Sequence, residues 1–110
     1  MKNDLRVMSA SSVGRGGVSV LHCAGSSAAL QALDALIGND RQSDSLLESG
    51  EVRYGAFYHP LTGQVIDDVV LVAPHPEARL LMGHGGTIGI QSLLDGLKAL
   101  GAEVVASLLN

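Results

Sequence analysis

The sequence predicts an α+β fold, in which two main helices pack against one side of a mixed β-sheet. Short runs of alternating apolar and polar residues, typical of strands, flank two segments with apolar residues at helical spacing. Of 110 residues, 46% are hydrophobic and only 3% aromatic, which indicates a packed core of aliphatic side chains. A chain of this length is expected to form a single domain over residues 1–110.

Two strands are expected near the N-terminus, at residues 5–8 and 18–23. Side chains alternate between the two faces of a strand, so the neighbours His22 and Cys23 point in opposite directions and cannot act as a pair. Cys23 is expected to be a small, buried, apolar residue. As the single cysteine it excludes an internal disulfide, which agrees with a reducing, cytoplasmic location.

The first helix is expected to begin at Ser26 or Ser27 and to run to about Ile37. A serine hydroxyl at this point can accept a hydrogen bond from the free N–H groups of the first helical turn. Apolar side chains follow at helical spacing through this segment. Gly38 is expected to lie just past the helix end, where glycine is common.

The middle of the chain predicts an antiparallel hairpin. After a polar connection at residues 39–50, residues 51–58 alternate between apolar and polar side chains. Residues 59–63 contain proline and glycine and indicate a turn, and residues 64–73 are expected to form the return strand. The segment Pro74-His75-Pro76 is expected to end this strand in an extended bend.

The C-terminal part predicts a strand at residues 78–82, a second helix at residues 88–100 and a last strand at residues 103–106. Apolar residues at helical spacing define the helix, and Gly101 is expected to end it. The predicted element order is therefore β-β-α-β-β-β-α-β.

Two glycine clusters are candidate ligand-binding loops. Gly14-Arg15-Gly16-Gly17 precedes the second strand, and Gly83-His84-Gly85-Gly86 precedes the second helix. A helix N-terminus presents free N–H groups to an anion or an electron-rich heterocycle, and Arg15 would add a positively charged fork. Neither cluster matches a phosphate-binding motif, and tight structural turns explain both clusters as well as a ligand site does.

The second cluster is expected to need glycine because of its backbone conformation. If Gly85 and Gly86 turn tightly at positive φ, valine at either position should destabilise the domain more than valine at Gly96, inside the helix. His84 is expected to be buried and hydrogen-bonded to the backbone, although it would also suit the lining of a hollow between the N-terminus of the second helix and the loop at Gly14–Gly17.

Several function classes find no support in the residues. The seven basic residues are scattered and the net charge is −4, so direct nucleic-acid binding is not expected. No run is long and apolar enough for a signal peptide or a membrane span. The four histidines lack metal-site spacing, and Asp67 and Asp68 project to opposite sides of a strand. No catalytic residue and no metal ligand is predicted, while the low charge favours a homodimer or a protein partner.

The two glycine clusters in combination resemble the N-terminal domain of the tRNA-modifying GTPase family MnmE, also called TrmE. The family has a Gly-Arg-Gly-Gly-Val loop, found here at residues 14–18, and a Gly-x-x-Ile/Leu-Asp turn, found here from Gly63 to Asp67. It also has a His-Gly-Gly motif before a helix, found here from His84. The resemblance covers roughly residues 5–105, and the combination is more specific than any one motif.

This resemblance implies a fold similar to the folate-binding domain of aminomethyltransferases, with homodimerisation and a tetrahydrofolate derivative bound near the dimer interface. The 110 residues do not contain the family's GTPase and helical domains or its cysteine motif. The arginine and glutamate that hold folate in the family correspond here to His22 and Leu80. The candidate cofactor-binding residues are Gly14, Arg15, Gly16, Gly17, His22, Gly83, His84, Gly85 and Gly86.

The favoured interpretation is a non-catalytic dimerising domain that binds a small ligand or a protein partner. The alternative is a tetrahydrofolate-binding one-carbon module that contributes to modification of the tRNA wobble uridine. Two further interpretations stay open at this point. One is a structural or regulatory dimer whose glycine clusters are only turns, and the other is a piece of a longer protein.

Overall fold

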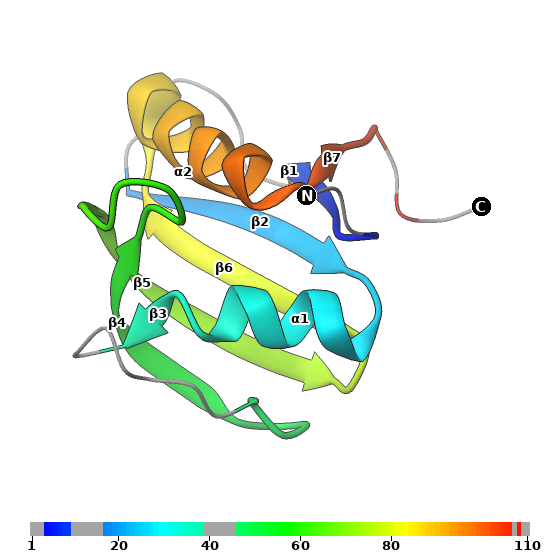
Figure 1. The fold of residues 1–110 in the computed structure, drawn as a ribbon. Coiled ribbons are helices and arrows are strands. Elements are labelled where there is room, and N and C mark those ends of the chain that lie inside the picture. Colours follow the sequence, from blue (N-terminus) through cyan, green and yellow to red (C-terminus); the bar gives the residue numbers. More distant parts are fainter. Residues whose placement is uncertain (1–3, 10–16, 39–45, 107, 109–110) are drawn as a thin grey trace.

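The computed structural model of the protein describes residues 4–9, 17–38, 46–106 and 108, and it confirms the α+β class. One seven-stranded sheet has the strand order β3-β4-β5-β6-β2-β1-β7 (Figure 1). Neighbouring strands are antiparallel except β1 and β7, which are parallel, so the sheet is mixed. The elements in chain order are β1 (Arg6–Ser9), β2 (Val18–Ala24), α1 (Ser27–Asp34), β3 (Ile37–Gly38), β4 (Val52–Tyr58), β5 (Val65–His75), β6 (Ala78–His84), α2 (Gly86–Leu100) and β7 (Glu103–Val104).

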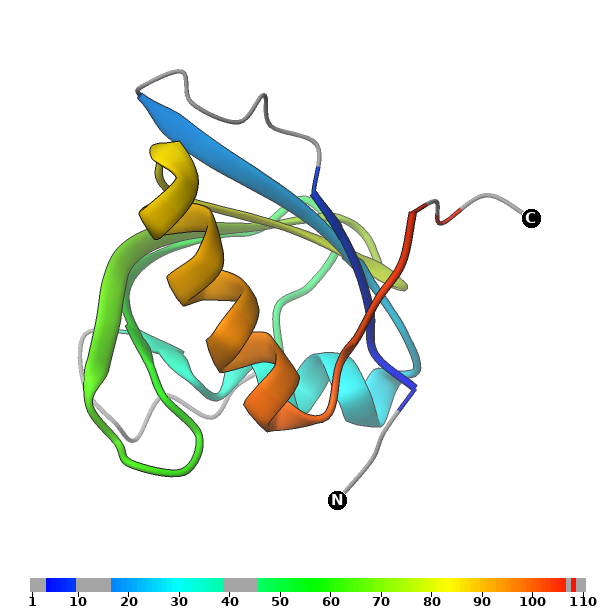
Figure 2. The ribbon, with the colours of Figure 1, turned by 90° about the horizontal axis from the view of Figure 1, so that it is seen from above.

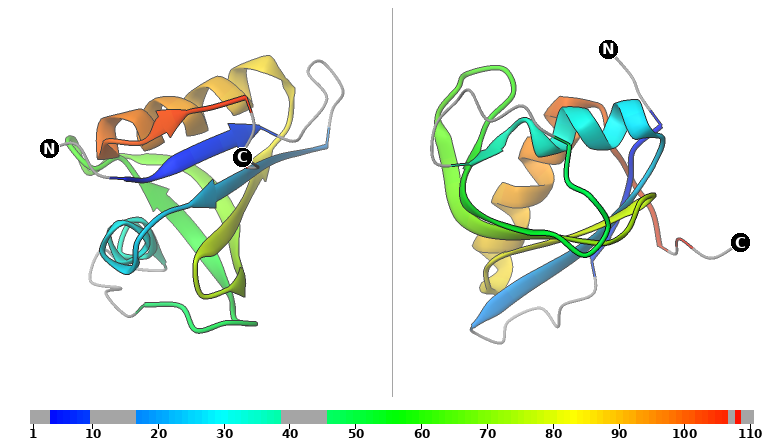
Figure 3. Two further views of the ribbon diagram at one scale, coloured as in Figure 1. Left: turned by 90° about the vertical axis from the view of Figure 1, so that its right-hand side faces the viewer. Right: turned by 90° about the horizontal axis from the view of Figure 1, so that it is seen from below.

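The two helices lie on the same side of the sheet, which curves around them (Figures 2 and 3). We call this side the inner face and the opposite side the outer face. Burial alternates along the strands as predicted, because every second side chain points to the helices. The core is aliphatic apart from one aromatic ring. Its fully buried apolar members are Leu5, Val7, Leu21, Leu30, Leu33, Ile37, Phe57, Leu71, Ala73, Leu81, Leu93 and Leu97.

The first helix begins as predicted but ends early. The Oγ atom of Ser26 caps α1 by accepting a backbone N–H of the first turn. The helix ends at Asp34, so the expectation that it reaches Ile37 and stops at Gly38 is wrong. Both residues form β3, which pairs with β4. A Cβ atom on Gly55 of β4 would lie 2.5 Å from the carbonyl carbon of Gly38, so β3 and β4 approach each other closely at this point. This strand pairing takes the place of the last helical turn that the sequence predicts.

The hairpin of β4 and β5 forms as predicted, but β5 and β6 are both longer than expected. β5 continues through Pro74 to His75, and its register with β6 shifts between Val72 and His75. The missing N–H of Pro74 therefore falls where the ladder is already interrupted. β6 continues to His84, so Gly83 and His84 belong to a strand and not to a loop as expected.

The expected positive φ angles in the second glycine cluster are wrong. Gly85 is the N-cap of α2 with φ −81° and ψ −175°, an extended conformation that any residue adopts, and Gly86 is the first helical residue. Gly101 does end α2 as predicted, with φ 112°. The glycines with positive φ among the described residues are Gly17, Gly50, Gly63 and Gly101.

A buried ion pair joins the end of α1 to β6. Arg79 Nε lies 2.9 Å from Asp34 Oδ1, and Arg79 Nη2 lies 2.9 Å from Asp34 Oδ2. Both side chains are 0% exposed. The N–H of Leu47 donates to the same carboxylate, and the Leu47 carbonyl accepts from Arg79. The carboxylate of Asp34 and the guanidinium of Arg79 are therefore both hydrogen-bonded. A buried ion pair needs such bonds to offset the loss of water around its charges. Within the part of the chain that the structure describes, no helix is long and apolar enough to cross a membrane.

Candidate functional site

The two glycine clusters meet where β2 begins and β6 passes into α2. The carbonyl of Gly17 accepts a hydrogen bond from the N–H of Gly85 at 3.1 Å. Val18, the first residue of β2, lies opposite His84 in the ladder. Of the first cluster only Gly17 is placed, directly beside the second cluster. The other three predicted site residues of that cluster, Gly14, Arg15 and Gly16, lie outside the described residues.

His84 is held by both oxygens of a single carboxylate, that of Asp67 in β5. The ring Nδ1 lies 2.5 Å from Asp67 Oδ1, and the backbone N–H of His84 donates to Oδ2 at 2.8 Å. The carbonyl of His84 accepts a hydrogen bond from the hydroxyl of Ser19, also at 2.5 Å. These three bonds fix the main chain and the ring of His84. In the neutral ring, donation from Nδ1 to the carboxylate leaves the other nitrogen, Nε2, as an acceptor.

The structure corrects the expectation that His84 is buried. Its side chain is 77% exposed, whereas that of Asp67 is 13% exposed. Burial opposes ionisation of Asp67, but hydrogen bonds from the backbone and ring of His84 and from the Asp68 N–H outweigh it. The pKa of Asp67 is therefore lowered, and the group is ionised at neutral pH.

Glycine at position 83 makes room for this carboxylate. A Cβ atom on Gly83 would lie 2.7 Å from Asp67 Oδ2 and 3.0 Å from Leu93 Cδ1 of α2. The second glycine cluster is thus explained at this position by close approach of a side chain, not by an unusual φ angle. A substitution of Gly83 would displace Asp67 and with it the ring of His84.

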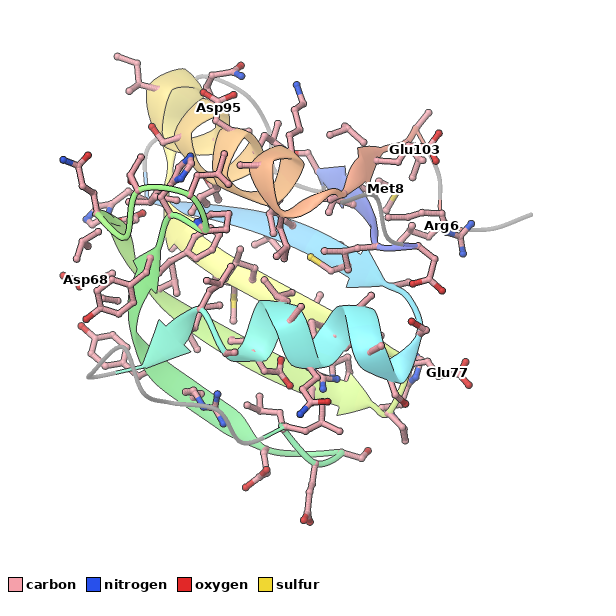
Figure 4. All side chains as sticks on the ribbon, viewed as in Figure 1. Arg6, Met8, Asp68, Glu77, Asp95 and Glu103 are labelled. Carbon is pink, nitrogen blue, oxygen red and sulfur yellow. The ribbon has the colours of Figure 1, made fainter. Side chains whose placement is uncertain are left out.

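A pocket of about 300 Å³ opens beside this pair. Its floor is a row of three side chains on neighbouring strands, because Tyr54 pairs with Val70 and Val70 pairs with Met82. Asp68 also lines it and lies at the hairpin side of the molecule (Figure 4). The complete lining is Gly17, Val18, Tyr54, Asp68, Val69, Val70, Met82, Gly83 and His84.

Three predicted site residues therefore line the pocket, Gly17, Gly83 and His84, and Gly85 adjoins it through its bond to Gly17. Sequence reasoning missed Tyr54, Asp68 and the other floor residues. The prolines at residues 74 and 76 could have indicated them, because a hairpin turn at this point pairs β5 with β6 and places Val70 beside Met82.

His22 does not line this pocket. It is half-buried in β2 and pairs across the ladder with Leu80. The neighbouring Cys23 points inward as predicted and is 1% exposed. Burial raises the pKa of its thiol to about 12, so it is unreactive in the folded chain.

A second, wider hollow of about 730 Å³ lies away from the predicted residues. Three of its lining residues, Arg6, Glu77 and Glu103, appear on the side of the molecule opposite Asp68 (Figure 4). Asp4 in this hollow accepts hydrogen bonds from the backbone N–H and the hydroxyl of Ser26, which lower its pKa.

No metal centre is found among the residues that the structure describes, because no three of their His, Cys, Asp or Glu side chains are grouped closely enough to hold an ion. No model of a protein family matches the chain, and no curated protein sequence matches it either.

Proposed function

We propose that this chain is a non-catalytic domain that pairs with a second copy through the outer face of its sheet and also binds a small ligand or a protein partner. The observation that supports pairing is a row of residues that crosses five neighbouring strands on the side without helices (Figure 3): Val52, Val72, Leu80, His22 and Met8. Four of these five side chains are apolar. An apolar sheet face without helices favours association with another surface.

A second copy is the partner that suits this face best. The chain carries a net charge of −4, so two copies repel each other unless they meet through faces without charged side chains. Neither this row nor the adjoining row of Tyr54, Val70 and Met82 contains a lysine, arginine or carboxylate. Two such faces can pack without opposing like charges, as stacked sheets do. The resemblance to the MnmE family also implies a homodimer.

Sedimentation of the wild-type chain and two variants tests this proposal. The wild type should sediment as a dimer at tens of micromolar. Val52→Lys places a charge at a position that is 63% exposed, so the fold should survive while pairing weakens by at least about tenfold. Leu61→Lys, at a position 77% exposed in the hairpin turn, is the matched control and should leave pairing unchanged. A wild-type monomer of 11.3 kDa at these concentrations would refute pairing.

The alternative function, a tetrahydrofolate-binding module for tRNA modification, predicts tight folate binding. We expect weak binding instead, because His22 and Leu80 stand at the positions of the family's arginine and glutamate. Each lost charge-assisted hydrogen bond costs about 1.5–3 kcal/mol, so two losses weaken binding by about two to four decades. Calorimetry with formyl-tetrahydrofolate decides between the two functions, since a micromolar or tighter dissociation constant would favour the one-carbon module.

A further inference from the structure

We propose that the pocket beside His84 binds a small organic cation with an apolar body, such as an aryl amidinium or an aryl ammonium ion. Three features of the pocket carry this inference. They are an apolar floor, an aromatic side chain and a carboxylate that is free to meet a positive charge. The inference does not depend on pairing of two chains.

The floor and the aromatic side chain come from three adjacent strands. Val70 and Met82 offer apolar surface that is half-buried, and Tyr54 stands beside them with 66% of its surface exposed. An exposed aromatic ring attracts a cation through the negative potential over its face, and this attraction grows as the ion loses water. A ligand with an apolar body and a positive end therefore satisfies both kinds of surface.

The carboxylate comes from Asp68, two residues before Val70 and on the same side of β5. Side chains diagonally opposed on neighbouring strands lie about 7–8 Å apart, so one small group fits between Asp68 and Tyr54. The other acid nearby, Asp67, is already bonded to His84 and to the Asp68 N–H. Asp68 is thus the group left to face a ligand.

The charges on the described lining favour a cation over an anion. Among the lining residues that the structure describes, none is a lysine or an arginine, and one is an aspartate. The volume of about 300 Å³ is at the lower end of the range for small-molecule sites, which suits a ligand of a single ring. An anion in this position would face Asp68, and the histidine that lines the pocket, His84, already holds the carboxylate of Asp67 through Nδ1.

Three probes of nearly equal shape test the assignment, namely benzamidine, benzamide and benzoate. They carry a positive, a neutral and a negative end on the same ring. Binding is followed by amide chemical shifts of the uniformly labelled chain at two protein concentrations. Benzamidine should bind at least about tenfold more tightly than benzoate, with benzamide between them, and the shifts should centre on Val70 and Met82.

Variants separate the pocket from the rest of the surface. Asp68→Asn and Tyr54→Leu should each weaken benzamidine binding by about threefold or more, and Asp68→Asn should also reduce the preference over benzoate. Glu77→Gln removes an exposed acid in the distant hollow. It should change neither the affinity for benzamidine nor the preference for benzamidine over benzoate. Equal affinity for benzamidine and benzoate, or loss of binding in none of the pocket variants, would overturn the proposal. A preference for benzoate would overturn it too, and would favour the candidate anion site to which Arg15 would contribute.

The two protein concentrations keep this proposal distinct from pairing of the chains. If pairing covers the pocket, benzamidine binds more weakly at the higher concentration but keeps its preference over benzoate. If the chains do not pair, the dissociation constant of benzamidine is the same at both protein concentrations. The order of affinity of the three probes then still decides the proposal.

Discussion

The ring of Phe57 in β4 lies against Gly96 in the middle of α2. A Cβ atom on Gly96 would be 3.2 Å from both Cε2 and Cζ of that ring, and it would also overlap Cδ1 of Ile66 in β5. The helix is therefore seated on the β4–β5 hairpin by the absence of a side chain at this position. Glycine inside a helix costs about 1 kcal/mol relative to alanine, so close packing must offset that cost here.

This contact reverses the order of stability effects that the sequence predicts for the glycines. Gly96→Val should destabilise the domain by about 1–3 kcal/mol, because overpacking pushes α2 away from Phe57. Gly85→Val should cost less, because the extended backbone at Gly85 accommodates valine without strain. Urea denaturation of the two variants measures both values. A larger loss for Gly85→Val would mean that α2 does not depend on its contact with the hairpin.

The buried ion pair makes a second prediction. Asp34→Ala should destabilise the domain by about 3–5 kcal/mol, because it leaves the guanidinium of Arg79 buried without its partner. The N–H of Leu47 would lose its acceptor as well. Asp95→Ala is the control, since Asp95 is exposed and, within the described part of the chain, bonds only Gln91 on the same helix. It should change stability by about 0.5 kcal/mol or less. Similar losses in the two variants would contradict a structural role for the pair.

The parts of the fold that the sequence predicts well are those with local causes. The serine cap of α1, the hairpin turn at Gly63 and the glycine end of α2 each depend on neighbouring residues, and all three are present. The inward position of Cys23 follows from strand alternation, which is local too. The fold class was predictable from these signals because together they define most of the elements.

The parts that the sequence does not predict depend on residues far apart in the chain. Asp34 and Arg79 are 45 positions apart, and an arginine at an inward strand position has no local pattern that marks it. The end of α1 is set by pairing of β3 with β4, which overrides helical spacing at Ile37. Asp67 meets His84 because β6 continues past its expected end at Met82 to His84.

The pH dependence of stability follows from Asp67. Its pKa is lowered in the folded chain from the ordinary value of 3.8, so the unfolded chain binds its proton more readily. The stability that Asp67 contributes is therefore complete above about pH 5 and is lost as the pH falls through the folded pKa, below 3.8. Asp67→Asn should accordingly be less stable than the wild type at neutral pH, and the difference should shrink on acidification through this range.

Urea midpoints measured from neutral pH to about pH 3 test this expectation. Asp68→Asn serves as the control, because Asp68 follows Asp67 in β5 but its side chain is exposed and does not hold His84. A difference between wild type and Asp67→Asn that stays constant over the whole range would show that the carboxylate charge does not stabilise the fold.

The thiol of Cys23 gives a direct measure of unfolding. It lies on the inner face of β2 at 1% exposure, and burial raises its pKa to about 12 despite the opposing charge of Arg79. Only the thiolate attacks a disulfide reagent, so the native chain should react with 5,5′-dithiobis(2-nitrobenzoate) no faster than it opens. The reaction should become rapid and stoichiometric in urea above the unfolding midpoint. A matched variant, Cys23→Ser with Val18→Cys, moves the thiol to an outer position that is 56% exposed and should react at once without denaturant. Equal native rates for the two proteins would contradict the inward orientation of Cys23, and with it the assignment of inner and outer faces on which both proposals depend.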